Sequence, residues 1–350
     1  MSERRTFMRG RYFLDYKVLR LIGQGGFADI YYVKEKKTNR QYALKVERKS
    51  SQKKTLALEK KIYEKVKDSF LFPKFITSGE TTNYNYIVTE CLGPSLTTVR
   101  KILPDVKYTM STGLRLGIEM LRCIADFHRY GFVHRDIKPA NFLIRASRAN
   151  PIVLIDFGLA RNHINPETKE PFEARDNVGF VGTAKYASLN AHECHDLSRR
   201  DDLISWWYSL IEILNGGLPW GTLTDKKEIY RMKLNTDYEK LCENLPKEIL
   251  SVRRCILQYS YEMEPNYNLL TSFLVLAMVK TKSTFDDYFD WEHLIAREKE
   301  HISAVSINPP AGDEPTIPIN LPPPVVPGDD EYSYSGEEDD TEKRKCCEIC

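Results

Sequence analysis

The sequence of 350 residues has no uninterrupted apolar run of the roughly 18–20 residues that a membrane-spanning helix needs. Residues 1–5 lack the apolar core of a secretory signal, so we expect the protein to be made and kept in the cytosol. Five of the eight cysteines stand singly, without the paired spacing of a disulfide framework or a zinc site. We expect reduced thiols at these five positions, which are Cys91, Cys123, Cys194, Cys242 and Cys255.

The chain also has little net charge, only +2 at pH 7, but the charge is unevenly distributed. Residues 328–350 hold nine acids and three Lys or Arg, which leaves 48 Lys or Arg against 40 Asp or Glu, a net of +8, on residues 1–327. A basic body attracts acidic or phosphorylated protein partners; a generic basic surface is the alternative. No basic stripe is interleaved with stacking aromatic residues, so the sequence does not favour nucleic-acid binding.

Two short motifs indicate phosphoryl transfer: HRDIKPAN at residues 134–141 and, at the end of an apolar stretch, DFG at residues 156–158. This chemistry needs one carboxylate to orient the attacking hydroxyl, and a second carboxylate and an amide to hold Mg²⁺ beside the phosphates. We assign the first role to Asp136 and the metal-binding role to Asn141 and Asp156. Alone, HRD often occurs by chance, and DFG is more often a strand ending in a turn. In this order and spacing they resemble the catalytic motifs of protein kinases.

A glycine-rich stretch near the N-terminus predicts a hairpin that folds over phosphates. It lies between two strand-like runs, residues 17–22 and 27–33, and its glycines let backbone N–H groups approach phosphate oxygens. A dinucleotide-binding fingerprint would instead open a helix after the glycines. The third glycine of the kinase pattern is Ala28 here, which leaves the fold prediction unchanged. We assign these residues to nucleotide binding: Ile22, Gly23, Gln24, Gly25, Gly26, Phe27, Ala28, Asp29 and Ile30.

The stretch YALK, residues 42–45, resembles the kinase strand whose lysine grips the α- and β-phosphates of ATP. Residues 55–67 then carry apolar or long side chains at helical spacing, which predicts a helix packed on the small lobe. Glu59 is the only well-placed acid on that helix, and we expect it to pair with Lys45. In isolation, Glu59 would be one member of a solvated charge run.

Further motifs are similar to those of the casein kinase 1 group, over nearly all of residues 12–297. They are GTAKYASLN at 182–190, where most kinases have Ala-Pro-Glu, SRRDDL at 198–203 and LPW at 218–220. NVGFVGT at 177–183 and DWE at 290–292 are more similar to the tau-tubulin kinase branch. The resemblance implies a serine/threonine protein kinase that uses ATP and Mg²⁺. Its expected substrates are acidic or pre-phosphorylated proteins.

The resemblance also implies a two-lobed α+β fold. Residues 1–92 would form a β-rich N-lobe ending in the hinge, residues 93–300 a helical C-lobe, and residues 301–350 a tail. The length of the chain and its hydrophobic content of 42% suit one such unit, although the length alone allows two domains. We expect the protein to be a monomer. Bulky residues at helical spacing predict two buried C-lobe helices, one with Trp206, Trp207, Tyr208, Leu210, Ile211 and Leu214 and one with Leu114, Ile118, Leu121, Ala125 and His128.

Residue roles at the nucleotide follow from the same resemblance. The hinge residues Glu90 and Leu92 would offer backbone contacts to adenine. Lys138 would neutralise charge on the transferring phosphoryl group. The apolar walls around adenine would be Ile22, Ile30, Ala43, Leu143 and Ile155.

On the side of the protein substrate, Thr183 would bridge Asp136 and Lys138. Asp202 would hold the backbone of the catalytic loop. Lys185 and Arg231 would recognise acid or phosphate in the substrate; the alternative is that both are ordinary exposed basic side chains.

Two functions of a different class are the alternatives to this one. A pseudokinase or scaffold is disfavoured because all five expected catalytic groups are present, namely Lys45, Glu59, Asp136, Asn141 and Asp156. A small-molecule phosphotransferase sharing the two lobes is disfavoured by the peptide-binding segment at residues 182–190.

The C-terminal region has three distinct parts. Residues 308–327 contain eight prolines and predict an extended linker, either a spacer or a ligand for an SH3 or WW domain. Residues 329–342 are acidic, and we expect them to be disordered. Cys347 stands four residues from the end, as in a prenylation site, and the neighbouring Cys346 could be acylated. Membrane attachment through such lipids and a chance cysteine-rich end are both compatible with this terminus.

Overall fold

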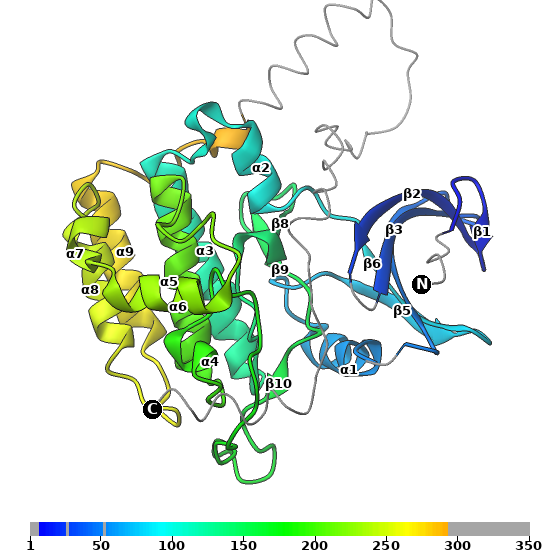
Figure 1. Cartoon of the computed structure of the whole chain (residues 1–350). Coiled ribbons are helices and arrows are strands. Elements are labelled where there is room, and N and C mark those ends of the chain that lie inside the picture. Colours follow the sequence, from blue (N-terminus) through cyan, green and yellow to red (C-terminus); the bar gives the residue numbers. More distant parts are fainter. Residues whose placement is uncertain (1–6, 26–27, 52–53, 293–350) are drawn as a thin grey trace, which may run out of the picture.

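The computed structural model describes residues 7–25, 28–51 and 54–292, and these form two lobes, one dominated by a sheet and one by helices (Figure 1). The expected two-lobed α+β fold is therefore confirmed. The predicted N-lobe boundary at residue 92 falls in the link between the last strand of the small lobe and the first helix of the large lobe. The predictions for residues 301–350 lie outside the described residues.

The small lobe is an antiparallel sheet with the strand order β1-β2-β3-β4-β6-β5. Its strands are β1 (Tyr12–Phe13), β2 (Tyr16–Gln24), β3 (Ala28–Glu35), β4 (Gln41–Arg48), β5 (Phe75–Glu80) and β6 (Tyr84–Glu90). Alternate residues of β3 and β4 point into one buried cluster, which explains the period-two pattern of Tyr31, Val33, Leu44 and Val46. The helix α1 (Leu56–Val66) lies beside this sheet and matches the predicted helix closely.

The large lobe is mainly helical. Its helices are α2 (Leu96–Ile102), α3 (Met110–Arg129), α4 (Leu189–His192), α5 (Arg199–Asn215), α6 (Lys226–Asn235), α7 (Tyr238–Leu241), α8 (Lys247–Ile256) and α9 (Tyr267–Lys280). Two short antiparallel ladders complete it, β7 (Phe132–Val133) with β10 (Arg161–Asn162), and β8 (Phe142–Ile144) with β9 (Ile152–Leu154). Single 3₁₀ turns occupy Pro104–Val106 and Pro139–Asn141.

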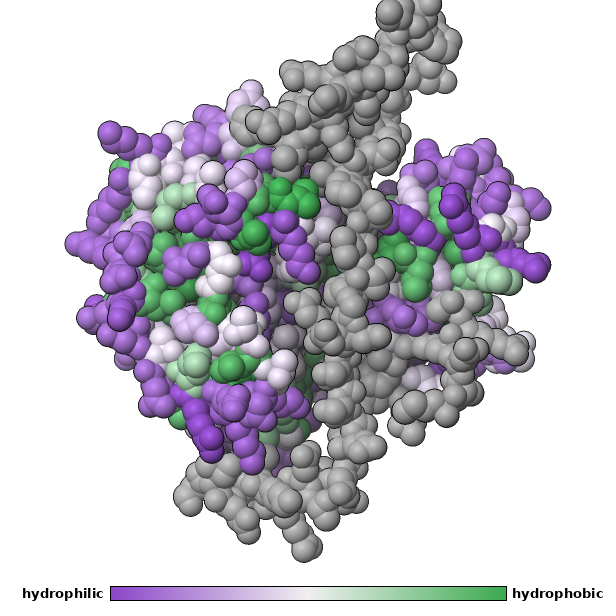
Figure 2. Space-filling model, turned by 45° about the horizontal axis from the view of Figure 1, so that its top comes forward, coloured by the Kyte–Doolittle hydropathy of each residue, from purple (hydrophilic) through white to green (hydrophobic). Residues whose placement is uncertain are grey.

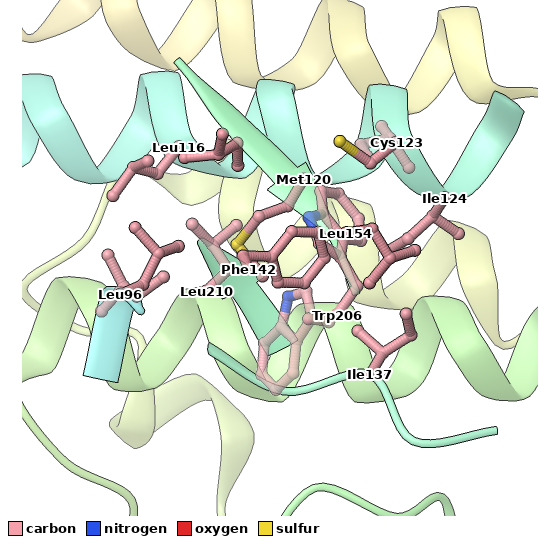
Figure 3. Packing of buried hydrophobic residues seen from close by; sticks show 14 of the residues in the cluster. Leu96, Leu116, Met120, Cys123, Ile124, Ile137, Phe142, Leu154, Trp206 and Leu210 are labelled. Carbon is pink, nitrogen blue, oxygen red and sulfur yellow. The ribbon is translucent and has the colours of Figure 1, made fainter. Parts of the chain in front are cut away.

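The core of the large lobe forms where α3 and α5 pack together, with β8 and β9 against them (Figure 3). Met120 of α3 and Trp206 and Leu210 of α5 are among its buried side chains. The indole nitrogen of Trp206 donates to the backbone oxygen of Gly117 at 2.9 Å, so this large ring is buried with its polar atom satisfied. Both predicted buried helices are confirmed, except that Ala125 is only half-buried.

Figure 2 shows hydrophilic residues over much of the surface of the helical lobe, with apolar residues in smaller patches. None of the helices within residues 7–292 that the structure describes is both long enough and apolar enough to cross a bilayer.

Candidate active site

The catalytic loop, residues 134–141, connects β7 to β8 and is held in place by hydrogen bonds to α5. The carboxylate of Asp202, buried in the first turn of α5, accepts from the backbone nitrogens of His134 at 2.6 Å and Arg135 at 2.7 Å. The side chain of His134 in turn lies 3.0 Å from the backbone oxygen of Ile155, which ties the loop to the segment that precedes Phe157. The expected role of Asp202 is thus present in the structure.

Asp136, Lys138 and Thr183 form a triangle in which each side chain contacts the other two. Oδ1 of Asp136 accepts from the hydroxyl of Thr183 at 2.7 Å, and its Oδ2 lies 2.9 Å from the Nζ of Lys138. Lys138 also donates to the Thr183 hydroxyl at 2.9 Å. The predicted bridge through Thr183 is therefore present, and it fixes the carboxylate of Asp136 without using a residue of the nucleotide-binding lobe.

Thr183 reaches this triangle because Gly182 precedes it. Gly182 has a φ of +101°, a conformation that only glycine adopts without strain. A Cβ at this position would stand 2.6 Å from the backbone oxygen of Arg135, a distance at which the catalytic loop or residues 182–190 would have to move apart. The glycine is thus what lets the two segments approach each other.

Asn141 and Asp156, the predicted metal ligands, offer groups that suit Mg²⁺. The amide nitrogen of Asn141 donates to the backbone oxygen of Asp136 at 2.8 Å, which leaves its amide oxygen to bind a cation. Asp156 keeps 46% of its side chain exposed, and the charge of Lys45 holds its pKa well below the usual range, so it is ionised at neutral pH. Mg²⁺ is typically bound by one or two carboxylates together with substrate phosphates. The described residues contain no group of three or more His, Cys, Asp or Glu side chains that could hold a metal ion.

Lys45 joins the two lobes electrostatically. Its Nζ, on β4, lies 2.7 Å from Oε1 of Glu59 on α1 and 3.0 Å from Oδ1 of Asp156. Burial lowers the pKa of Lys45, but the two carboxylates outweigh that effect and raise it, so the side chain is an ammonium ion. The predicted pair of Lys45 and Glu59 is therefore formed, with Glu59 buried.

The glycine-rich hairpin is the turn between β2 and β3. Gly23 pairs with Ile30 and Gln24 with Asp29 across it, and the nitrogen of Gly25 donates to the oxygen of Ala28 at 2.9 Å. Gly26 and Phe27, which we also assign to nucleotide binding, lie outside the described residues. The residues expected to form apolar walls around adenine are all half-buried, and their contact with adenine stays a prediction: Ile22, Ile30, Ala43, Leu143 and Ile155.

At the hinge, the side chain of Glu90 has a structural task. Its Oε1 accepts from the backbone nitrogen of Lys74 at 2.7 Å and pairs with Arg145. This arrangement fixes the end of β6. The contact of adenine with the backbone of Glu90 and Leu92, which the resemblance implies, stays a prediction. Arg145 was not identified from the sequence, since it stands 55 residues away from its partner.

Lys185 and Arg231, the predicted anion-binding residues, do not form a common site with two unengaged positive charges in the described structure. Lys185 donates to Oε1 of Glu212 at 2.7 Å, and Arg100 of α2 lies 3.1 Å from the same oxygen. Two cations thus share one buried carboxylate and leave one positive charge in excess beside the segment 182–190. Arg231 is exposed on α6, and no side-chain interaction links it to Lys185 within the described residues.

Lys233 is a residue of this region that the sequence analysis missed. It is fully buried on α6, and its Nζ donates to the backbone oxygens of Ala184 at 2.7 Å and Ala187 at 2.6 Å. It therefore supports the same segment that carries Thr183 and Lys185. The signal that could have found it is its spacing of four from Ile229, which places both residues on the inner face of the helix.

Comparisons with known proteins agree with this geometry. A model of the protein kinase domain matches residues 16–275. A probable serine/threonine-protein kinase of Dictyostelium discoideum is 38% identical over 289 residues, which cover 82% of this chain and 57% of that protein. The serine/threonine-protein kinase spe-6 of Caenorhabditis elegans is 33% identical over 287 residues, which cover 79% of this chain and 76% of that protein. The chain thus spans little more than half the length of the Dictyostelium relative.

Proposed function

This chain belongs to the protein kinase family and carries a serine/threonine protein kinase domain, and we propose that the whole protein is an ATP-dependent kinase of the casein kinase 1 type. The observation that carries the phosphoryl-transfer activity is the triangle of Asp136, Lys138 and Thr183, which places a carboxylate and an ammonium group side by side. The casein kinase 1 type is supported by the motifs at residues 182–190, 198–203 and 218–220. The motifs at residues 177–183 and 290–292 support the tau-tubulin kinase branch within that group.

The residues divide the work of phosphoryl transfer. Asp136 orients the hydroxyl of the protein substrate and accepts its proton, and Lys138 offsets charge on the transferring phosphoryl group. Lys45, held by Glu59, positions the phosphates of ATP, which is the second substrate. Asn141 and Asp156 would hold Mg²⁺, which would supply charge neutralisation at the phosphates.

We further propose that acidic or pre-phosphorylated protein segments are the preferred substrates. The support is the excess positive charge that Lys185 and Arg100 leave around Glu212, next to residues 182–190. The net charge of +8 on residues 1–327 adds long-range attraction of the same sign. Arg231 would add a second cation only where a substrate extends along the exposed side of α6.

A peptide array tests both proposals. Matched peptides carry Ser, Thr or Tyr at the target position, with Asp, phosphoserine or Ala upstream of it. We expect incorporation of phosphate from ATP into Ser and Thr but not Tyr, and faster incorporation where the upstream residue is anionic. Incorporation into Tyr alone would contradict the serine/threonine activity, whereas equal rates with Asp and Ala upstream would contradict only the substrate preference.

For localisation, we propose a cytosolic protein that is attached to membranes through Cys347. Because one lipid chain gives marginal residence, a second signal is needed, and acylation of Cys346 is the better candidate. The three basic residues at 343–345 would offer roughly 1 kcal/mol each near an anionic leaflet, but eight acids at 329–342 oppose them. Both segments lie outside the described residues.

Replacing Cys347 by Ser is then expected to move the protein from membrane to soluble fractions, as measured by fractionation and immunoblotting of cells. Cys346→Ser is the matched control, and it should weaken attachment without preventing the first modification. Mass spectrometry of the protein from its native cell gives the decisive comparison, because an unmodified terminus ending at Cys350 rules the attachment out.

A further inference from the structure

The strand that carries Lys45 also carries a buried acid with an unusual set of partners. Glu47 on β4 is fully buried, and its Oε1 accepts from the backbone nitrogens of Thr55 at 2.7 Å and Leu56 at 3.2 Å. Its Oε2 lies 3.5 Å from the amide nitrogen of Asn85 on the neighbouring strand β6. Glu47 therefore connects the sheet to the first residues of α1.

This contact does the work of a helix cap. The first N–H groups of a helix have no partner within the helix, and a carboxylate near them is favoured by the helix dipole. Thr55 occupies the N-cap position of α1, but its side chain makes no capping hydrogen bond. The cap is supplied instead from another element, by Glu47, which fixes where α1 begins relative to β4.

The position of α1 matters because Glu59 lies one turn into it. Lys45 and Glu47 are two residues apart on β4, so the strand binds the helix at two points. The hydroxyl of Thr55 lies between the two carboxylates, at 3.3 Å from Oε1 of Glu47 and 3.4 Å from Oε1 of Glu59. The same end of α1 also packs on the DFG motif, since a Cβ on Gly158 would meet Oε1 of Glu59 at 3.2 Å and Cβ of Thr55 at 3.6 Å.

We propose that Glu47 is a positioning residue for the kinase reaction: it caps α1 from β4 and so holds Glu59 in place for Lys45. This inference rests on the proposed function. Glu47 itself touches neither substrate, and it acts only through the pair that positions the phosphates of ATP. A kinase whose α1 shifts outward or rotates loses that pair even though every catalytic side chain is still present.

The test uses the full chain with Glu47→Ala and with Glu47→Gln, which retains the volume and an oxygen acceptor. Steady-state rates per folded protein are measured against ATP and, separately, against a peptide substrate. For Glu47→Ala we expect kcat/KM for ATP to fall about tenfold, equivalent to about 1.4 kcal/mol, while KM for the peptide stays within about twofold. Glu47→Gln should restore part of the loss. The control is Glu80→Ala, an exposed acid of the same sheet that pairs with Lys49 at 2.8 Å, which should leave all values unchanged.

A double-mutant cycle with Glu59→Gln separates positioning from a merely structural role. If Glu47 acts through Glu59, then Glu47→Ala should change kcat/KM for ATP less than twofold in the Glu59→Gln background. An undiminished loss in that background overturns the proposal, as does a wild-type kcat/KM for Glu47→Gln and Glu47→Ala alike. Failure of the proposed function itself would look different, because the wild-type chain would then transfer no phosphate.

Discussion

Replacing Asp136 by asparagine should lower kcat for phosphoryl transfer by about 10²- to 10⁴-fold, the range typical for the loss of a general base. The asparagine side chain has nearly the same shape, and its oxygen can still accept from Thr183, which lies 2.7 Å from the present Oδ1. It cannot take a proton from the substrate hydroxyl, however, and it no longer attracts Lys138. The chemical step should therefore be slowed while the surrounding loop keeps its structure.

Nucleotide affinity should barely change in this variant, because Asp136 lies in the triangle with Lys138 and Thr183 and not with Lys45. Calorimetric titration with ATP and Mg²⁺, paired with single-turnover rates, measures the two effects separately. Lys45→Ala is the contrasting variant, since removing the ammonium group from between Glu59 and Asp156 should impair nucleotide positioning and rate together. An Asp136→Asn enzyme within tenfold of the wild-type kcat would remove Asp136 from its proposed role.

The parts of the site that residue types and spacing predict without the resemblance are those formed by residues close together in the sequence. Asp136, Lys138 and Asn141 lie within one short loop, so their spacing alone fixes their relation. The pair of Lys45 and Glu59 is predictable for a similar reason, because a strand and the helix that follows it allow few ways for an acid to meet the lysine. Here the residue types and their spacing carry most of the geometry.

Contacts that join distant segments were predicted only where the family resemblance implied them, as for Thr183 with Asp136 and for Asp202 with the catalytic loop. Glu212 lies in an apolar stretch of α5 and binds Lys185, 27 residues away, and Arg100, 112 residues away, and neither sequence neighbourhood shows this. A basic residue looks the same in a sequence whether it is exposed, as Arg231 is, or buried, as Lys233 is. The expected substrate cation at position 185 is consequently already engaged by a carboxylate of its own chain, and only the excess charge of the cluster remains to attract a substrate.

The long-range contact with the largest expected effect on stability is that of Asp202. In Asp202→Ala the backbone nitrogens of His134 and Arg135 lose the carboxylate to which they donate, and unpaired buried donors cost about 1–3 kcal/mol each. The neutral ring of His128, whose pKa is lowered by burial in spite of Asp202, loses its partner at Nε2 as well. A loss of several kcal/mol is a large part of the roughly 5–15 kcal/mol that stabilises a typical domain.

Urea denaturation of Asp202→Ala, with the rate of phosphoryl transfer measured on the folded fraction, tests this expectation. Activity should fall even where the protein is folded, because the loop that carries Asp136 is no longer held. Asp225→Ala is the matched control: that aspartate caps the exposed end of α6 at 2.9 Å from the nitrogen of Glu228, and its loss should cost only about 1 kcal/mol.

The pH dependence follows from the direction of the Asp202 pKa. Burial raises it, but the hydrogen bonds from His128 and from the backbone outweigh burial and bring it below 3.8. A carboxylate with a lowered pKa stabilises the fold above the pKa it has in the unfolded chain, and loses that contribution as the pH falls through its folded value. The difference in unfolding free energy between wild type and Asp202→Ala should therefore be constant from about pH 5 to pH 8 as far as this carboxylate is concerned. If Asp202→Ala lost no more unfolding free energy than Asp225→Ala between pH 5 and pH 8, the catalytic loop would be held by other contacts.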